Sequence, residues 1–349
     1  MYNKKIIYVL TIVSGIILLI ALGAGFYVST EINKTSEALS LYRDNKEAGY
    51  HIMMFLDKSN QMYSDAFRAG VNEVAKEHNI AVELISIDRS NYIEELLDRL
   101  DLAMYAKVDG IIVHAYLDER IIGKIEQAKD MGIPVVTLNE DLPLRSRITY
   151  VGINRYNMGL VVGETIAKKT GGSGKLAVIE QKGFLRKGEQ NITKKTDLMI
   201  QGINDVFERY DDLSLEVVRY IERGVLRAGT VATEILQEYP SINAIYSTDG
   251  QSTLGIVQVL IDNNRVKDFV LVSFGDNEGV LHYIGKGDII EATIVTDYKE
   301  IGKSAVRAFY EYKTTGVAKS HVNVPMQVVD ENNVESYMKE KSEAYEKNE

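Results

Sequence analysis

Between Tyr50 and Leu138 the chain repeats one pattern of apolar and polar positions three times. Each unit is a short apolar run, a polar turn and a segment with the spacing of an amphipathic helix. Strands that alternate with helices of about 10–15 residues predict a parallel, doubly wound α/β sheet. The apolar runs are His51–Leu56, Ala81–Ile87, Gly110–His114 and, opening a fourth unit, Pro134–Leu138; the helical segments lie near Gln61–His78, Asn91–Ala106 and Asp118–Met131.

A second alternating series follows an apolar run at Ile148–Val151 and a helical segment at Tyr156–Lys169. The body of about 300 residues is too long for one ordinary domain and suits two. We therefore predict an α/β fold with two doubly wound parallel-sheet lobes. The expected strands are Lys175–Ile179, Leu215–Tyr220, Ala244–Ser247, Phe269–Phe274, Glu291–Val295 and Val322–Val329, and the expected helices lie near Thr196–Arg209, Ala228–Glu238, Ser252–Asn263, Glu278–Ile284, Lys299–Tyr312 and Asn332–Lys347.

The residues ahead of this body are first apolar and then polar. Ile6–Val28 contains no charged side chain, and its roughly 23 residues span about 34 Å as a helix, enough to cross a bilayer core of about 30 Å. We predict a single-pass membrane anchor over residues 1–28 and a polar stalk over 29–49. A cleaved signal peptide ending near Ala21–Gly23 is the alternative, although such signals have a shorter apolar core. Lys4 and Lys5 should stay in the cytoplasm, which places the body outside it.

Composition excludes several kinds of chemistry. The chain has no cysteine, so it can form neither disulfides nor thiolate metal sites, and it has no thiol nucleophile. It carries 40 Lys and Arg against 50 Asp and Glu, a net charge of −10. Phosphate binding needs clustered basic side chains, so we do not expect nucleic acid as a partner.

Two features that look reactive have simpler explanations. Gly171–Lys175 resembles a phosphate-binding loop, but a helix precedes it, a strand follows it, and Leu176 stands where a hydroxyl residue is required. We expect a helix end and a turn there. The five histidines lack the spacing of metal ligands, and no Gly-x-Ser-x-Gly motif occurs. We therefore expect no enzymatic activity, no metal and no cofactor.

Polar side chains follow the predicted strands at the edge where doubly wound sheets bind ligands. They are mainly Asp, Asn, Glu and Tyr, which suit the hydroxyl groups and flat faces of a small polyhydroxy ligand. Alternatively, the Asp and Asn side chains only cap helices. His114, at the end of the third strand, either lines the pocket or packs beside it. The positions are Asp57–Tyr63, His114–Tyr116, Asn139–Asp141, Asn154–Arg155, Gln181–Glu189, Asp249–Gln251, Asp276–Asn277 and Asp297–Tyr298.

Short phrases in a characteristic order run along the body. They are Phe67–Gly70, Val108–Val113, Gly132–Asn139, Tyr150–Asn154 with Gly159 and Ile166–Lys169, Tyr239–Tyr246, Val272–Asp276 and Glu291–Ile294. In this order and spacing the chain, over Tyr50–Val329, resembles the periplasmic sugar-binding proteins of the ribose-binding type. These in turn resemble the effector domains of the lactose-repressor family. No helix-turn-helix pattern occurs ahead of Tyr50 in this sequence, so we do not expect a DNA-binding repressor.

The resemblance implies two similar lobes that close on a ligand about a hinge of three crossing segments. By analogy the crossings fall near Ile153–Asn154, Thr296–Asp297 and Pro325–Met326. Lobe one would be residues 50–153 plus 297–325, and lobe two would be 154–296 plus 326–349.

The resemblance also implies ligand positions, which are strand-end residues of both lobes. The family's aromatic pair after the first strand corresponds to Met62 and Tyr63. The other implied positions are Asn139, Glu140, Asn154, Asp249, Asp276 and Thr296–Asp297. We add His114 as a candidate because of its place at the end of the third strand.

Two departures from the family pattern bear on the ligand. Glu140 replaces an arginine, and the family's arginine in lobe two has no clear match, with Lys194, Lys195, Arg223 and Arg227 as candidates to replace it. The implied pocket is unusually acidic. Carboxylates favour a neutral sugar or polyol, or a cationic amine through charge-assisted bonds, over an anion.

Two functions compete on these grounds. The first is capture of a small solute for an ABC importer, with a membrane permease as partner. The second is a membrane-anchored sugar sensor whose ligand-bound form engages a sensor histidine kinase. Both functions need closure that depends on ligand. An enzyme is a third possibility on this fold, but the sequence offers no nucleophile–base pair to support it.

We expect the N-terminal segment to be retained in the mature protein. Mass spectrometry of the membrane fraction of cells expressing the full chain should detect the intact N-terminus, and protease added to spheroplasts should digest the body from outside. A mature chain that begins shortly after Gly23 would show a cleaved signal instead. An N-terminus on the same side of the bilayer as the body would contradict the predicted topology.

Overall fold

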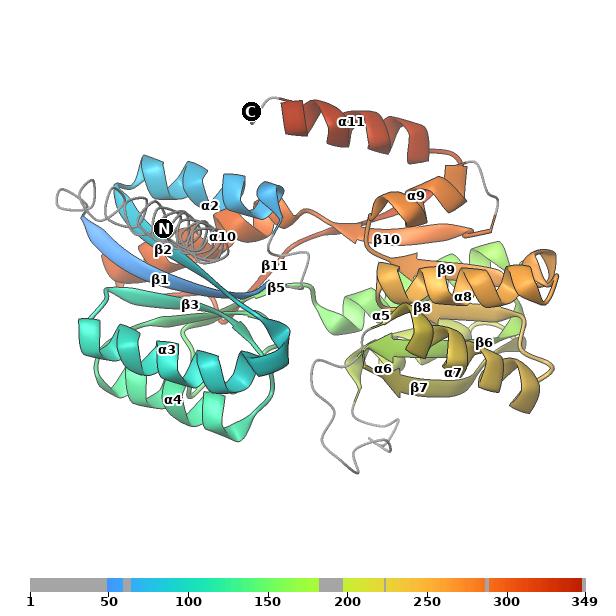
Figure 1. The fold of residues 1–349 in the computed structure, drawn as a ribbon, viewed down its shortest axis with the longest axis horizontal. Coiled ribbons are helices and arrows are strands. Elements are labelled where there is room, and N and C mark those ends of the chain that lie inside the picture. The colour runs from blue at the N-terminus through green and yellow to red at the C-terminus, as the bar shows by residue number, and fades with distance from the viewer. Residues whose placement is uncertain (1–48, 59–63, 182–196, 223, 286–288, 347–349) are drawn as a thin grey trace, which may run out of the picture.

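The structure is a computed structural model that describes residues 49–58, 64–181, 197–222, 224–285 and 289–346. Within these residues the chain forms two six-stranded sheets, each with helices on both faces (Figure 1). The predicted two-lobed α/β architecture is confirmed. The predicted anchor at 1–28 and all of the stalk except Gly49 lie outside the described residues. Among the helices that are described, none combines the length and the apolar character of a membrane span.

Lobe one, as we name the first sheet and its helices, has the strand order β11-β5-β4-β3-β1-β2, and its strands pair in parallel. Helices α2 and α10 pack on one face of the sheet, and α3 and α4 pack on the other. The elements are β1 (Tyr50–Asp57), α2 (Asp65–Glu77), β2 (Ile80–Ile87), η3 (Arg89–Asn91), α3 (Tyr92–Ala106), β3 (Gly110–Ala115), α4 (Glu119–Asp130), β4 (Val135–Asn139), β5 (Thr149–Gly152), α10 (Tyr298–Thr315) and β11 (His321–Asn323).

Lobe two has the order β12-β10-β9-β8-β6-β7, with β12 antiparallel to β10 at one edge. Helices α5 and α6 pack on one face, and α7, α8, α9 and the start of α11 pack on the other. The elements are α5 (Arg155–Lys169), β6 (Ser173–Gln181), α6 (Leu198–Phe207), β7 (Asp212–Ile221), α7 (Val225–Glu238), β8 (Ala244–Ser247), α8 (Gly250–Asp262), η5 (Val266–Asp268), β9 (Val270–Phe274), α9 (Glu278–Gly285), β10 (Ala292–Thr296), β12 (Met326–Asp330) and α11 (Val334–Glu346).

The chain passes between the two sheets three times, from β5 to α5, from β10 to α10 and from β11 to β12. The third passage shows that the single strand predicted over Val322–Val329 is wrong. The structure divides it at Val324 and Pro325 into β11 in one sheet and β12 in the other. The strand breaks there because proline lacks the N–H group that a continuous ladder of hydrogen bonds needs. The sequence pattern hid the break because β11 and β12 are both partly buried, so apolar and polar residues alternate across it.

Two glycines allow α10 to return to lobe one in close contact with α2. A Cβ on Gly70 would lie 2.0 Å from the carbonyl oxygen of Lys299, and a Cβ on Gly302 would lie 2.3 Å from a backbone oxygen of α2. Only glycine lets two helix backbones approach so closely. Gly159 and Gly202 serve α5 and α6 in the same way in lobe two. The helix that follows the second crossing is therefore fixed to lobe one by its backbone.

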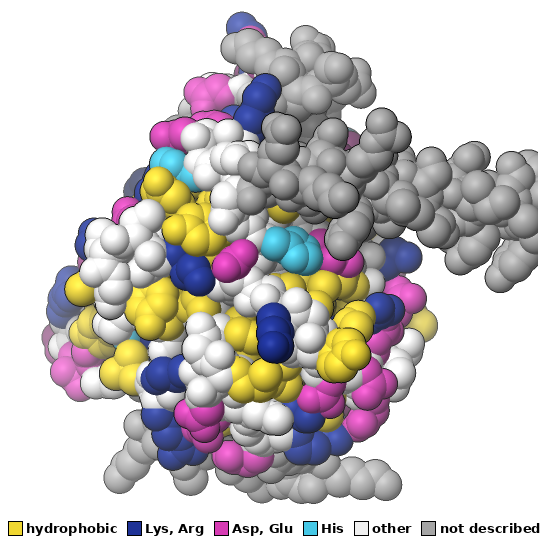
Figure 2. Space-filling model, turned by 90° about the vertical axis from the view of Figure 1, so that its left-hand side faces the viewer, with side chains coloured by type: hydrophobic (Ala, Val, Ile, Leu, Met, Phe, Trp, Pro, Cys, Tyr) yellow, Lys and Arg dark blue, Asp and Glu magenta, His cyan; other side chains and the backbone are white. Residues whose placement is uncertain are grey.

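The outer end of lobe one, which faces away from lobe two, mixes side chains of every kind. Figure 2 shows hydrophobic, basic and acidic groups interspersed over the described part of this face, without an extended field of one sign. Such a mixture is typical of a soluble surface. It gives no support to phosphate or nucleic acid binding at this end.

Gly70→Ala should lower the free energy of unfolding by about 1–3 kcal/mol, because the helix backbones must separate to admit the methyl group. Urea denaturation followed by circular dichroism measures the change. Gly123→Ala is the control: Gly123 is exposed inside α4 with open space around its Cβ position. Removal of a helical glycine there should stabilise the protein by up to about 1 kcal/mol. Equal effects of the two substitutions would contradict the close α2–α10 contact.

Candidate ligand-binding site between the lobes

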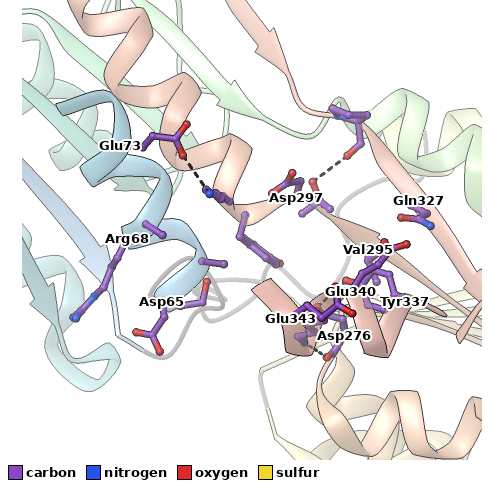
Figure 3. Close-up of a pocket in the computed structure, with 18 of the residues that line it drawn as sticks. Asp65, Arg68, Glu73, Asp276, Val295, Asp297, Gln327, Tyr337, Glu340 and Glu343 are labelled. Atoms are coloured by element: carbon purple, nitrogen blue, oxygen red, sulfur yellow. Dashed lines mark hydrogen bonds and ion pairs between the residues drawn. The ribbon is translucent and has the colours of Figure 1, made fainter. Parts of the chain in front are cut away.

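A groove of about 1510 Å³ lies between the lobes. Helix α2 forms one wall, and α11 with the residues after β9 forms the opposite wall (Figure 3). Its floor is made of two of the crossing segments, at 295–299 and 325–327. The labelled side chains in Figure 3 come from α2 (Asp65, Arg68 and Glu73), from lobe two and α11 (Asp276, Tyr337, Glu340 and Glu343) and from the crossings between them (Val295, Asp297 and Gln327).

Asp276, which follows β9, is held in the groove by α11. The Tyr337 hydroxyl donates to Asp276 Oδ2 at 2.8 Å. The Lys341 ammonium forms an ion pair with the same oxygen at 2.7 Å and donates to the Asp276 carbonyl oxygen at 2.7 Å. Burial, and then the charge of Asp276, raise the pKa of Tyr337, so the phenol stays protonated and remains a donor. Asp276 is a predicted ligand position, and its partners on α11 were not predicted.

Three predicted ligand residues cap helices. Asn154, Asp249 and Asp297 accept hydrogen bonds from backbone N–H groups in the first turns of α5, α8 and α10, at 2.9, 2.8 and 3.0 Å. Each of the three side chains therefore makes one hydrogen bond that caps a helix, as the alternative to ligand binding predicted. A carboxylate can accept several hydrogen bonds, so capping fixes its orientation and remains compatible with ligand binding.

Asn139 and Glu140, the predicted positions at the end of β4, form hydrogen bonds with the backbone at the end of β3 and just after it. The Asn139 amide donates to the Ala115 carbonyl oxygen at 3.1 Å, and Asn139 has a φ of 68°, which asparagine tolerates better than most residues. The Glu140 carboxylate accepts from the Leu117 N–H at 2.7 Å. Met62 and Tyr63, predicted after β1, lie outside the described residues.

The structure brings some predicted residues together and leaves others apart. Asp276 and Asp297 line the same groove. The remaining described candidates lie at the carboxyl edges of the two sheets but not in the lining of this groove; they are His114, Asn139, Glu140, Asn154 and Asp249.

His114 is fully buried and packs beside the strand ends. Its ring lies 5.1 Å from the Tyr116 ring and 6.2 Å from the Tyr92 ring, between centroids. Neither ring nitrogen has a hydrogen-bond partner among the described residues. Burial lowers the pKa of His114 to about 4, while the nearby charge of Asp57 opposes that shift. Of the two alternatives for His114, packing fits the structure better.

A charged cluster lies at the ends of three neighbouring strands of lobe one, where the sequence predicted Asp57 and Tyr116 as strand-end positions but missed their partner Arg89. Asp57 ends β1 and is fully buried, Arg89 follows β2, and Tyr116 follows β3. Arg89 Nη1 donates to Asp57 Oδ2 and to the Tyr116 hydroxyl, both at 2.9 Å, and Tyr116 donates to Asp57 Oδ2 at 2.6 Å. A buried carboxylate needs such partners, because an unpaired charge there is costly.

A second charged cluster lies at the strand ends of lobe two. Arg155, the first residue of α5, donates through Nη2 to Glu180 Oε1 at 2.8 Å and to Asp197 Oδ1 at 2.9 Å. Both carboxylates are buried, whereas the Arg155 side chain is 43% exposed. Arg155 is one of the predicted strand-end positions, whereas Glu180 precedes the predicted segment 181–189 by one residue and Asp197 was not singled out. The sequence therefore predicted the arginine but not its two partners.

The site therefore offers hydrogen-bond donors and acceptors held in place by neighbouring side chains. Guanidinium and carboxylate groups stand at the strand ends of both lobes, and Asp65, Asp276 and Asp297 line the groove. Such groups suit a ligand with several hydroxyls. In the parts of the chain that the structure describes, no three His, Asp or Glu side chains gather as metal ligands.

Comparison with known proteins identifies the family. Residues 52–316 match the family model described as "Periplasmic binding protein domain". The chain belongs to the periplasmic binding protein family. It is 24% identical over 251 residues to the ribose import binding protein RbsB of Bacillus subtilis, a match that covers 71% of this chain and 77% of RbsB. It is 23% identical over 271 residues to the ABC transporter periplasmic-binding protein YphF of Escherichia coli, covering 72% of this chain and 76% of YphF.

Solved structures agree with this assignment. The glucose-galactose binding protein GanP of Geobacillus stearothermophilus superimposes with a TM-score of 0.72 at 26% identity, covering 82% of this chain and 99% of GanP. A chain of the XylFII-LytSN complex superimposes with a TM-score of 0.67 at 26% identity, covering 81% of this chain and 98% of that one. The resemblance found in the sequence is confirmed, and the relatives are solute-binding proteins and not enzymes.

The buried state of His114 predicts a loss of stability in mild acid. The unfolded histidine takes up a proton near pH 6.5 and the folded one only near 4. Within that window the unfolded state binds more protons, so stability falls as the pH drops from about 6.5 to about 4. Urea denaturation at pH 7 and pH 5 should show a smaller loss for His114→Leu, which has no titrating ring. The same loss in both proteins would contradict the prediction.

Proposed function

We propose that this chain binds a small sugar or polyol outside the cytoplasm by closing its two lobes, and delivers it to an ABC importer through a membrane permease. The observation that carries the proposal is the groove, whose walls belong to different lobes and whose floor is formed by crossing segments. The hinge would be residues 153–154, 296–297 and 325–326, with lobes of 50–153 plus 297–325 and 154–296 plus 326–349.

Closure follows from contacts that a ligand makes on both walls. A ligand shifts the open–closed equilibrium by the difference between its affinities for the two states. A ligand between α2 and the β9 end touches both lobes only when they approach one another, so it favours the closed form. Three short crossings can absorb such a rotation without changing the packing inside either lobe.

The charges around the groove support an uncharged polyhydroxy ligand. Asp276 and Asp297 supply acceptors for ligand hydroxyls from the groove lining. Glu140, Asp249 and Arg155 stand at strand ends outside that lining, and we propose that closure brings them to the ligand. The groove lining holds six Asp and Glu residues against four Lys and Arg residues. This acidic balance disfavours an anion, whereas a cationic amine is a second acceptable class. RbsB and GanP, whose names specify ribose and glucose or galactose, support a sugar.

A specific observation favours a second function, that of a membrane-anchored sugar sensor. A chain of the XylFII-LytSN complex is 26% identical to this one and shares its fold. An uncleaved N-terminal anchor over residues 1–28 would suit a lasting complex with a membrane partner such as a sensor histidine kinase. Deletion of the gene separates the two functions: loss of labelled-sugar uptake supports import, and intact uptake with loss of sugar-induced transcription supports sensing.

We expect sugar-dependent thermal stabilisation that requires Asp249. At large excess over a micromolar dissociation constant, a bound sugar should raise the melting temperature of the detergent-solubilised full chain by a few degrees. Asp249→Ser keeps a good N-cap for α8, so the unliganded melting temperature should change little, but the ligand-induced shift should be lost.

The control is Asp262→Ser at the other end of α8, which should keep the full shift because Asp262 is exposed and remote from the strand ends. An unchanged shift in Asp249→Ser would remove Asp249 from the site. No shift of the wild-type chain with any sugar or polyol would contradict the proposed ligand class.

A further inference from the structure

We propose that Tyr337 and Lys341 of α11 are positioning residues of the ligand site, which hold the Asp276 carboxylate in the orientation that meets the ligand. On this proposal the C-terminal helix α11 contributes to ligand binding as one wall of the groove. This inference rests on the proposed function, since it assumes that a ligand occupies the groove.

Helix α11 starts from a turn that is fixed to lobe two. The Asn333 side chain accepts from the Asp330 N–H at 2.8 Å and donates to the Val328 carbonyl oxygen at 2.9 Å. Val334, the first residue of α11, is 1% exposed and belongs to the lobe-two core. The helix therefore projects over the groove from a rigid base.

The spacing along α11 directs two donors to one carboxylate oxygen. Tyr337 and Lys341 are four residues apart and share a helix face. Both bond Asp276 Oδ2, and Lys341 also bonds the Asp276 carbonyl oxygen. No described residue donates to Asp276 Oδ1. The arrangement commits one oxygen to α11 and leaves the other for a ligand hydroxyl.

The backbone ahead of Asp276 is fixed from the opposite side. Gly275 has a φ of 100°, its N–H donates to the Ile294 carbonyl oxygen at 2.8 Å, and its own carbonyl oxygen accepts from the Thr293 hydroxyl at 2.6 Å. Hydrogen bonds from β10 to Gly275 and from α11 to Asp276 therefore hold this segment on both sides. Residues fixed in this way can orient a ligand group closely, because little motion remains to be lost on binding.

The same helix carries an ion pair that serves as a comparison. Lys341 and Asp276 have side chains that are 28% and 17% exposed, so water screens their attraction only in part. Lys339 and Glu343 are 4.0 Å apart with side chains 78% and 53% exposed, as is usual for pairs of little consequence. Lys339 is not in the groove lining, so Lys339→Met changes the charge of α11 and leaves the contacts of Asp276 in place.

The test is isothermal titration of the detergent-solubilised full chain with D-ribose, D-glucose, D-galactose and D-allose as separate probes. For the sugar that binds, Lys341→Met should weaken binding about tenfold or more, as expected for loss of a hydrogen bond to a charged group. Tyr337→Phe should weaken it less. Lys341→Arg should restore most of the affinity, and Lys339→Met should leave it unchanged.

A double mutant separates positioning from a general effect on folding. In an Asp276→Ala background, which itself binds weakly, Lys341→Met should cause no further loss, because the two residues act as one unit. Additive losses would overturn the positioning role, as would a Lys341→Met affinity within twofold of wild type, and both results would leave the proposed function standing. Failure of all four sugars to bind the wild-type chain would overturn the proposed function and this inference together.

Discussion

The interlacing of the two lobes is the constraint on which the rest of the structure depends. Neither sheet is completed by a continuous stretch of chain, because α10 and β11 return to lobe one after β10, and β12 then returns to lobe two. The backbone contact at Gly70 and Gly302 fixes that return, and Phe309 of α10 is fully buried in the lobe-one core. Packing of this kind favours rigid lobes, and under the proposed function the residues that cross between the sheets would take up the motion between them.

The two lobes present charged groups that are already bonded within the protein. Arg89 is tied to Asp57, and Arg155 is tied to Glu180 and Asp197, at the carboxyl edges of their sheets. These bonds offset the free-energy cost of burying the carboxylates. They also restrict the conformations of the side chains before any ligand binds. If these groups meet the proposed ligand, the same contacts serve both stability and recognition in a protein without disulfides.

The periodicity of the sequence was enough to predict most of the elements. The strand Ala244–Ser247 has the predicted bounds, and the predicted turn at Gly171 and Gly172 ends α5, with both glycines at positive φ. The prediction of one strand across Val324 and Pro325 was wrong. Alternation of apolar and polar residues shows that one face of a strand is buried, but it does not show to which sheet the strand belongs. The helix at the C-terminus was expected, but its place over the groove was not.

The site was harder to predict because its side chains meet only in three dimensions. Asp57 belongs with Arg89 once β1 lies beside β2, and nothing in the local pattern around either residue indicates that pairing. Tyr337 reaches Asp276 across 61 residues of sequence. The rule that ligands bind at strand ends directed the prediction to the loops after the strands, whereas the contacts of each polar residue within those loops depend on the packing of neighbouring elements.

The position of β1 determines where a segment ahead of residue 49 joins lobe one. Residue 49 leads into β1 at the outer end of lobe one, and β1 runs for eight residues toward the interlobe side, about 26 Å at the usual rise of a strand (Figure 1). A segment joined ahead of residue 49 therefore enters lobe one at the end remote from the groove. An attachment at that end would hold lobe one in place and leave lobe two as the lobe that moves on closure, so the half of the molecule farthest from the attachment would display the state of the groove.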